Sequence, residues 1–121
     1  MRRVIVVALL AAGCVTSASR ADNEALCTGL QADLKGVVLD DALTREQASA
    51  AAARLDPRVT QVADPGLHDA VVRLHQHLHA IDVAFRKRGP SDVARAIVRA
   101  RADAKRAARA CHLPEDAFLG R

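Results

Sequence analysis

The chain has 121 residues, a formal net charge of +4 and only two aromatic residues, both phenylalanine. This length suits one domain but not two. The sequence lacks the nucleophile-elbow, zinc-protease, P-loop and dinucleotide-binding motifs, so we do not predict an enzyme.

The first fourteen residues, MRRVIVVALLAAGC, have the pattern of an export signal. Arg2 and Arg3 precede an apolar run from Val4 to Ala12, which is shorter than the roughly 20 apolar residues that a membrane span needs. We therefore predict that residues 1–21 form a signal peptide and tether, and that the protein is exported. The remainder, residues 22–121, is predicted to be a single helical domain.

Ala11-Ala12-Gly13-Cys14 resembles the lipobox of bacterial lipoproteins, although Ala11 stands where that motif usually has leucine. The resemblance implies lipidation of Cys14 and a place at the outer face of the cell membrane. The alternative is ordinary signal-peptidase cleavage, for which Ser19-Arg20-Ala21 has a suitable pattern. That cleavage would release a secreted protein without Cys14.

Four helical segments and no strand are predicted from residue 22 onward. The first runs from about Asp22 to Leu39. Its apolar face has helical spacing: Leu26, Leu30, Leu34 and Val37 or Val38. The second is short; it starts at Thr44, where Gln47 completes a capping-box pattern, and stops near Asp56-Pro57. Residues 58–63 are predicted to form a loop or an irregular turn.

The third segment has Asp64 as its cap and Pro65 at its first position, and it ends at Gly89-Pro90. Its apolar residues keep a heptad spacing: Leu67, Val71, Leu74, Leu78, Ile81 and Phe85. The fourth begins with Ser91 as N-cap and finishes before Leu113-Pro114. Its predicted buried residues are Val93, Ile97, Ala100, Ala104, Ala107 and Cys111. A further short turn can follow around Phe118.

Short connections favour antiparallel neighbours, so we predict an all-α, four-helix, up-down-up-down bundle with a short second helix and no sheet. This topology places Cys27 and Cys111 at the same end. An oxidising compartment would let them pair, closing a loop of about 85 residues that contributes roughly 4 kcal/mol. Two buried thiols are the alternative. A covalent tie suits a core rich in alanine, which buries little area.

Three histidines, His68, His75 and His79, lie within about 40° of one another on the third helix, with Asp82 beside them. We call these four residues the histidine stripe. His75 and His79 are four residues apart and can chelate one divalent transition metal, with Asp82 or His68 as a third ligand. The alternative is that they are partly exposed residues at the edge of the apolar face. His77 points to the opposite flank, and His112 is expected in the last turn of the fourth helix, near the negative end of its dipole.

One cysteine in the first helix and a second in Cys111-His112-Leu113-Pro114 give the chain an outline that resembles the secreted haemophore haem-binding family. The resemblance implies haem binding, which in that family involves tyrosine as well as histidine. This chain has no tyrosine. If haem binds, the candidates from the residues themselves are His68, His75 and His79.

Charge is unevenly distributed after the signal: residues 22–64 hold eight acids and four bases, whereas residues 86–109 hold nine bases and two acids. The fourth helix carries a basic face, preceded by Arg86, Lys87 and Arg88. The basic face consists of Arg95, Arg99, Lys105, Arg106 and Arg109. It is either a solvated face or a contact for an anionic membrane surface, a cell-wall polymer or an acidic protein partner. Nucleic acid is not expected, because export removes it and no aromatic residue lies near the basic face to stack on bases.

Overall fold

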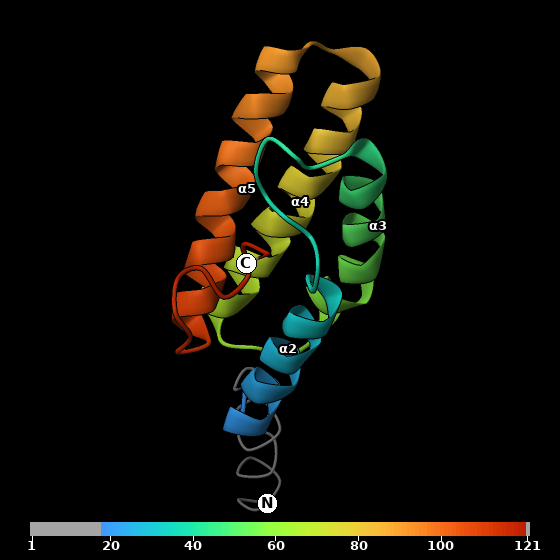
Figure 1. Ribbon diagram of the computed structural model, residues 1–121. Helices are drawn as coiled ribbons and strands as arrows, with labels where there is room; N and C mark the ends of the chain where they lie inside the picture. The colour runs from blue at the N-terminus through green and yellow to red at the C-terminus, as the bar shows by residue number, and fades with distance from the viewer. Residues whose placement is uncertain (1–17, 121) are drawn as a thin grey trace, which may run out of the picture.

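The structure is a computed structural model that describes residues 18–120. Within that range the chain is helical, with no strand, as the sequence predicts (Figure 1). The elements are α2 (Arg20–Asp33), α3 (Arg45–Leu55), the 3-10 helix η1 (Asp56–Thr60), α4 (Pro65–Lys87) and α5 (Pro90–Ala110). Residues 1–17 of the predicted signal peptide and tether, with the predicted lipidation site Cys14, lie outside the described residues. The rest of the predicted tether is partly helical, because Ser19 is the N-cap of α2 and the helix begins at Arg20.

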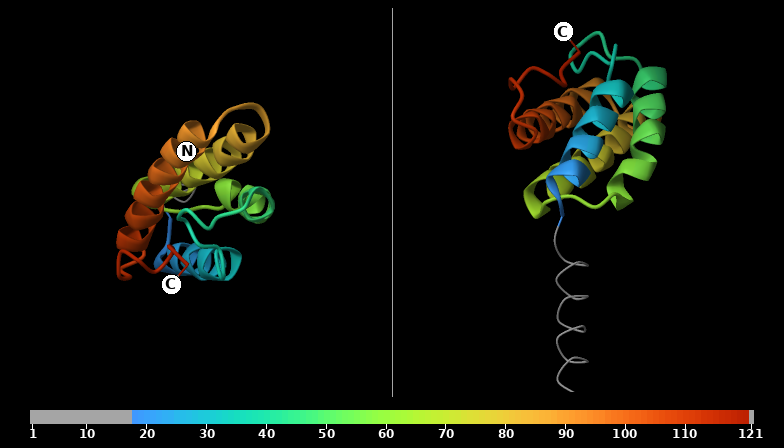
Figure 2. Two further views of the ribbon diagram at one scale, coloured as in Figure 1. Left: turned by 45° about the horizontal axis from the view of Figure 1, so that its top comes forward. Right: turned by 90° about the horizontal axis from the view of Figure 1, so that it is seen from below.

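The helices pack as a bundle in which α4 and α5 form a long antiparallel hairpin (Figure 1). The chain rises through α2 and then through residues 34–44, which we call the crossing segment. It descends α3, rises again through α4 and descends α5 (Figure 1). Figure 2 shows α2 and α3 side by side next to this hairpin. The connection between α4 and α5 lies at the opposite end of the bundle from the start of α2, and it extends beyond α3 (Figure 1).

The first helix is shorter than predicted, since α2 ends at Asp33 instead of continuing to Leu39. Gly36 follows with a φ of +79°, a left-handed conformation that ends the helix and that glycine adopts without steric cost. Val37 and Leu39 remain buried, but in an extended segment rather than a helix. The apolar pattern therefore identified core residues correctly and their secondary structure wrongly.

The second helix begins as predicted, because Thr44 and Gln47 form the capping box with hydrogen bonds of 3.0 and 3.1 Å. After α3, η1 replaces part of the predicted loop and positions Arg58 over α2. The Arg58 Nε donates to Asp33 Oδ2 at 2.7 Å, and this bond raises the pKa of Arg58. A Cβ atom on Gly29 would lie 2.5 Å from the Arg58 guanidinium carbon, so a larger residue at this position would displace the Arg58 side chain.

The helix α4 begins as predicted, with Asp64 at the N-cap position and Pro65 as its first residue. The Asp64 side chain makes no capping hydrogen bond, however, and instead accepts a 2.8 Å hydrogen bond from Asn23 Nδ2. Gly89 is the N-cap of α5, so this helix begins at Pro90 and not after Ser91. The α5 face towards the core consists mainly of small side chains: Ala96, Ile97, Ala100, Ala104, Ala107 and Ala108. Such a face lets α4 and α5 approach closely while it contributes little apolar area.

Cys27 of α2 and Cys111 at the end of α5 form a disulfide with a Cα–Cα distance of 5.8 Å. This pairing and the shared end of the two helices were both predicted. Immediately afterwards His112 ends the helix with a φ of +59°, so it lies outside α5 and not in its last turn. The His112 N–H donates to the Arg109 carbonyl at 3.0 Å, and the Leu113 N–H to the Ala108 carbonyl at 2.9 Å. These two bonds form a Schellman motif that turns the chain back toward the bundle.

The C-terminal tail then packs against the crossing segment (Figure 1). Phe118 is buried to 1% exposure, which makes it the largest fully buried side chain in the part of the chain described. The Leu39 N–H donates to the Leu119 carbonyl at 3.4 Å, and Arg101 of α5 donates to the Leu39 carbonyl at 2.7 Å. The tail and the crossing segment thus complete the core that the shortened α2 leaves open.

Candidate functional site

The structure separates the histidine stripe into parts with different partners. His75 Nε2 lies 2.5 Å from Asp56 Oδ1, a residue of η1 that the sequence marked only as a helix stop. His79 lies near it, and both line an open hollow of about 330 Å³. His68 is exposed at the start of α4 and does not line this hollow.

Asp82, the predicted carboxylate ligand, lines the same hollow but is held by arginines. Its Oδ1 is 3.2 Å from Arg45 Nε of α3, and its Oδ2 is 3.2 Å from Arg86 Nη2 on its own helix. Within residues 18–120 no group of three or more His, Cys, Asp or Glu side chains has an arrangement that could hold a metal ion. The metal or haem carrier therefore stays a prediction from the sequence.

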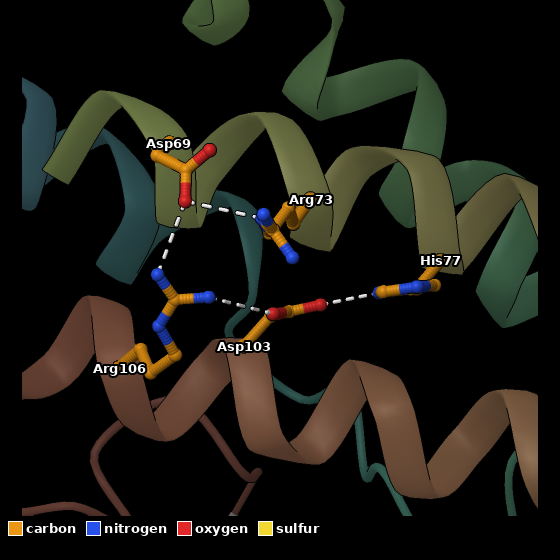
Figure 3. A network of polar contacts seen from close by, with 5 residues as sticks. All are labelled: Asp69, Arg73, His77, Asp103 and Arg106. Carbon is orange, nitrogen blue, oxygen red and sulfur yellow. Dashed lines mark hydrogen bonds and ion pairs between the residues drawn. The ribbon is translucent and has the colours of Figure 1, made fainter. Parts of the chain in front are cut away.

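His77, on the opposite flank as expected, belongs to a polar network between α4 and α5 (Figure 3). Its Nδ1 contacts Oδ2 of Asp103, which is buried to 5% exposure. Arg106 lies 3.6 Å from the other oxygen of Asp103 and donates to Asp69 at 3.1 Å, and Asp69 also accepts from Arg73 at 3.1 Å. We call these five residues the α4–α5 network. Because a buried carboxylate needs such partners, the network holds the two helices in one register.

Lowering the pH will remove the contribution of Asp69 to stability. The hydrogen bond from Arg106, with a smaller effect from Arg73, lowers the pKa of Asp69 below its usual value. The contribution is therefore complete above the unfolded-state pKa of about 3.9 and is lost as the pH falls through the folded-state pKa. We expect Asp69→Asn to lower the melting temperature at pH 7 and to have no effect near pH 2, in thermal scans across that range. Asp116→Asn, an exposed carboxylate outside the network, is the control; a pH-independent effect of Asp69→Asn would contradict the assignment.

Three of the five cations of the predicted basic face have carboxylate partners. Arg106 is part of the α4–α5 network, and Arg109 Nη1 pairs with Glu115 Oε2 at 2.5 Å. Arg95 makes a loose pair with Asp92 at 3.8 Å. Only Arg99 and Lys105 of the five lack an ion pair among the described residues. The sequence showed the spacing of these cations along α5 but not which of them face a carboxylate.

Other cations without an ion pair lie at the connection between α4 and α5, which we call the hairpin end. Lys87 and Arg88 are exposed there and have no ion pair in the described range, and Arg95 and Arg99 lie on the following turns of α5. A groove of about 460 Å³ includes Arg88, Arg95 and Arg99 in its lining, with Asp92 as its one carboxylate. We call it the arginine groove.

The hairpin end also has an apolar side. Phe85, in the last turns of α4, was predicted to lie in the apolar seam, but it is 37% exposed. This prediction was wrong because α3 does not reach the last turn of α4. The first residue of α3, Arg45, pairs with Asp82, and α4 continues from there to Lys87 without α3 beside it. Phe85 therefore lines an open hollow of about 340 Å³ together with Leu43, Val93 and Ile97. We call it the Phe85 hollow.

Comparisons with protein-family models, with curated proteins and with solved structures each gave no match to this chain. The fold and the site of residues 18–120 define the class: an all-α bundle with a disulfide between α2 and the end of α5, and a basic hairpin end. None of the helices in residues 18–120 has the length and apolar character that a membrane span requires.

Proposed function

We propose that this protein is an exported, non-enzymatic envelope protein that binds an anionic partner through its hairpin end. The observation that carries the proposal is the set of cations there, Lys87, Arg88 and Arg99, that face solvent without an ion pair in the described range. Cations already bound to carboxylates attract other anions weakly, whereas a cluster of one sign raises the local potential and speeds association.

The position of the hairpin end favours a partner away from the anchoring membrane. If Cys14 carries the lipid, the tether from Val15 to Ser19 spans at most about 18 Å. The α4 helix, 23 residues long, extends about 35 Å, and the hairpin end lies at its far end from the start of α2 (Figure 1). Such a tether leaves the basic surface directed outward, toward an acidic protein or a cell-wall polymer rather than toward the lipid headgroups beside the anchor.

Charge reversal tests the proposal. We expect Arg88→Glu/Arg99→Glu to reduce binding of fluorescent polyglutamate at 50 mM salt by tenfold or more, measured by anisotropy, because two attractive charges become repulsive. The matched control reverses two exposed cations elsewhere, Arg20→Glu/Lys35→Glu, and gives the same net charge. Equal losses in the two variants, or no binding by the unmodified protein, would reject the hairpin end as the binding surface.

A further inference from the structure

The arginine groove continues the seam between α4 and α5 that the α4–α5 network occupies further down the hairpin. His77 of α4 contacts Asp103 of α5 across this seam (Figure 3). Ala80 lies three residues after His77, about one turn closer to the hairpin end and on the same face of α4. Arg99 lies four residues before Asp103 on α5, so it is opposite Ala80 in this antiparallel pair, and both residues line the groove. The network and the groove are therefore successive parts of one surface.

The two parts of this surface differ in what α4 supplies to the cations of α5. In the network, Asp69 of α4 accepts a 3.1 Å hydrogen bond from Arg106. In the groove, α4 contributes alkyl side chains to the lining: Ala80, Val83 and Ala84. Arg99 has no ion pair within residues 18–120, and the one carboxylate of the groove, Asp92, lies 3.8 Å from Arg95. The groove thus has a position opposite Arg99 that suits a carboxylate from another molecule.

The lining of the groove suits a glutamate side chain better than a polysaccharide. Apart from its three arginines and Asp92, the lining is alkyl: Ala80, Val83, Ala84 and Ala96. Sugar hydroxyl groups would lose water against these side chains without gaining a hydrogen bond, which costs free energy. A glutamate brings two methylene groups to the alkyl lining and a carboxylate that a guanidinium can bind through two parallel hydrogen bonds. The groove therefore favours an acidic protein over a cell-wall polymer.

The spacing of the arginines favours an extended segment of such a protein. Arg95 and Arg99 are one helical turn apart, about 6 Å along α5. Alternate side chains of an extended chain point to the same side and are about 6.6 Å apart. Because α4 and α5 pack against each other, single side chains can enter the seam between them, whereas a partner helix about 10 Å across cannot. The groove volume of about 460 Å³ is in the range of ligand clefts and has room for several side chains.

We infer that the arginine groove binds an extended acidic segment of a partner protein, with glutamates at alternate positions whose carboxylates reach Arg88, Arg95 and Arg99. This inference rests on the proposed function, because it names the class of anionic partner and places its site on one side of the hairpin end. One of the glutamates fills the position opposite Arg99. Asp92 limits the affinity, since its charge repels the ligand and competes for Arg95.

The first test supplies the carboxylate from the chain itself. Ala80 is exposed, so Ala80→Glu places a glutamate opposite Arg99 without disturbing the core. The probe is a fluorescent nine-residue peptide with glutamate at every second position and serine between, titrated against the full chain in its oxidised form at 50 mM salt. We expect Ala80→Glu to weaken its binding about tenfold, because the new carboxylate occupies the cation and repels the ligand. Ala53→Glu makes the same change at an exposed alanine of α3 outside the groove, and it should weaken binding by less than about twofold. Equal losses in the two variants would overturn the inference.

The second test removes the competing carboxylate. Asp92→Asn should strengthen binding of the same peptide about threefold, because it removes a repelling charge and releases Arg95. Asp41→Asn is the matched control: it makes the same charge change at a residue that lines the Phe85 hollow and not the groove, and it should leave the affinity nearly unchanged. Loss of the fold cannot produce tighter binding, so this result does not depend on stability. Equal gains, or no gain from Asp92→Asn, would contradict the placement of the ligand in the groove.

The outcomes separate this inference from the proposed function. If neither polyglutamate nor the peptide binds, both are wrong. If both ligands bind but Ala80→Glu behaves as its control does, the groove is wrong and the anionic binding of the hairpin end stands. Equal or tighter binding of a second peptide, with the same composition but consecutive glutamates, would overturn the alternating register. Tighter binding to polygalacturonate, a carboxylated polysaccharide, that Ala80→Glu weakens would replace the protein segment by a cell-wall polymer.

Discussion

Replacing Cys27 and Cys111 by serine will lower the free energy of unfolding by about 4 kcal/mol. The disulfide closes a loop with a sequence separation of 84, and the chain-entropy model assigns this stabilisation to a loop of that length. The alanine-rich face of α5 makes the loss large relative to the total, because a domain of about 100 residues has only 5–15 kcal/mol of stability. We therefore expect a fall in melting temperature of roughly 20 °C.

The loss of local stability on removing the disulfide should be greatest in α2, because few other contacts hold this helix. Besides Leu26 and Leu30 in the core, α2 is held by the Arg58–Asp33 ion pair, the Asn23–Asp64 hydrogen bonds and a 3.2 Å hydrogen bond from Arg54 to the Asp33 carbonyl. Hydrogen exchange should thus show the amides of α2 opening before those of α4. Either single cysteine variant should lose as much as the double variant, since one serine already breaks the bond. Additive single losses, or a double loss below about 1 kcal/mol, would show that the bond contributes little.

The features that the sequence predicted correctly depend on local signals or on one simple topological step. The capping box of Thr44 and Gln47 lies within a single helical turn, and it formed as expected. The heptad residues of α4 from Leu67 to Ile81 are buried because the helix period alone places them on one face. The disulfide followed from the antiparallel order of the helices, which brings the start of α2 to the end of α5.

The features that the sequence did not predict depend on how far each helix extends beside its neighbours. No local pattern pairs His77 with Asp103, because the contact requires the register between α4 and α5. The same register places Arg106 of α5 against Asp69 of α4, so the charge of Arg106 is paired and no longer contributes freely to the basic face. Asp56 approaches His75 only because η1 packs against α4. Because carboxylates pair with three of the five cations of the basic face, the candidate site is the hairpin end and not the whole face of α5.

Phe118→Ala will destabilise the protein by about 3–5 kcal/mol, the usual cost of emptying a fully buried phenylalanine site. Phe118 is 1% exposed, and it anchors the tail whose Leu119 carbonyl accepts from the crossing segment. The variant loses the buried area and weakens the attachment of the tail to the core that Val37 and Leu39 share with Phe118. Urea unfolding of the oxidised protein measures the change, with the slope of the transition showing whether the tail also detaches.

Phe85→Ala is the matched control, because the chain has only these two phenylalanines and the change in side chain is identical. Phe85 keeps 37% of its surface exposed beyond the start of α3, so its removal should cost about 1–2 kcal/mol, less than the removal of Phe118. The heptad pattern alone would predict the reverse order, with Phe85 in the seam and Phe118 in a tail. A larger loss for Phe85→Ala would mean that the end of α4 is covered in solution and that the Phe85 hollow is closed.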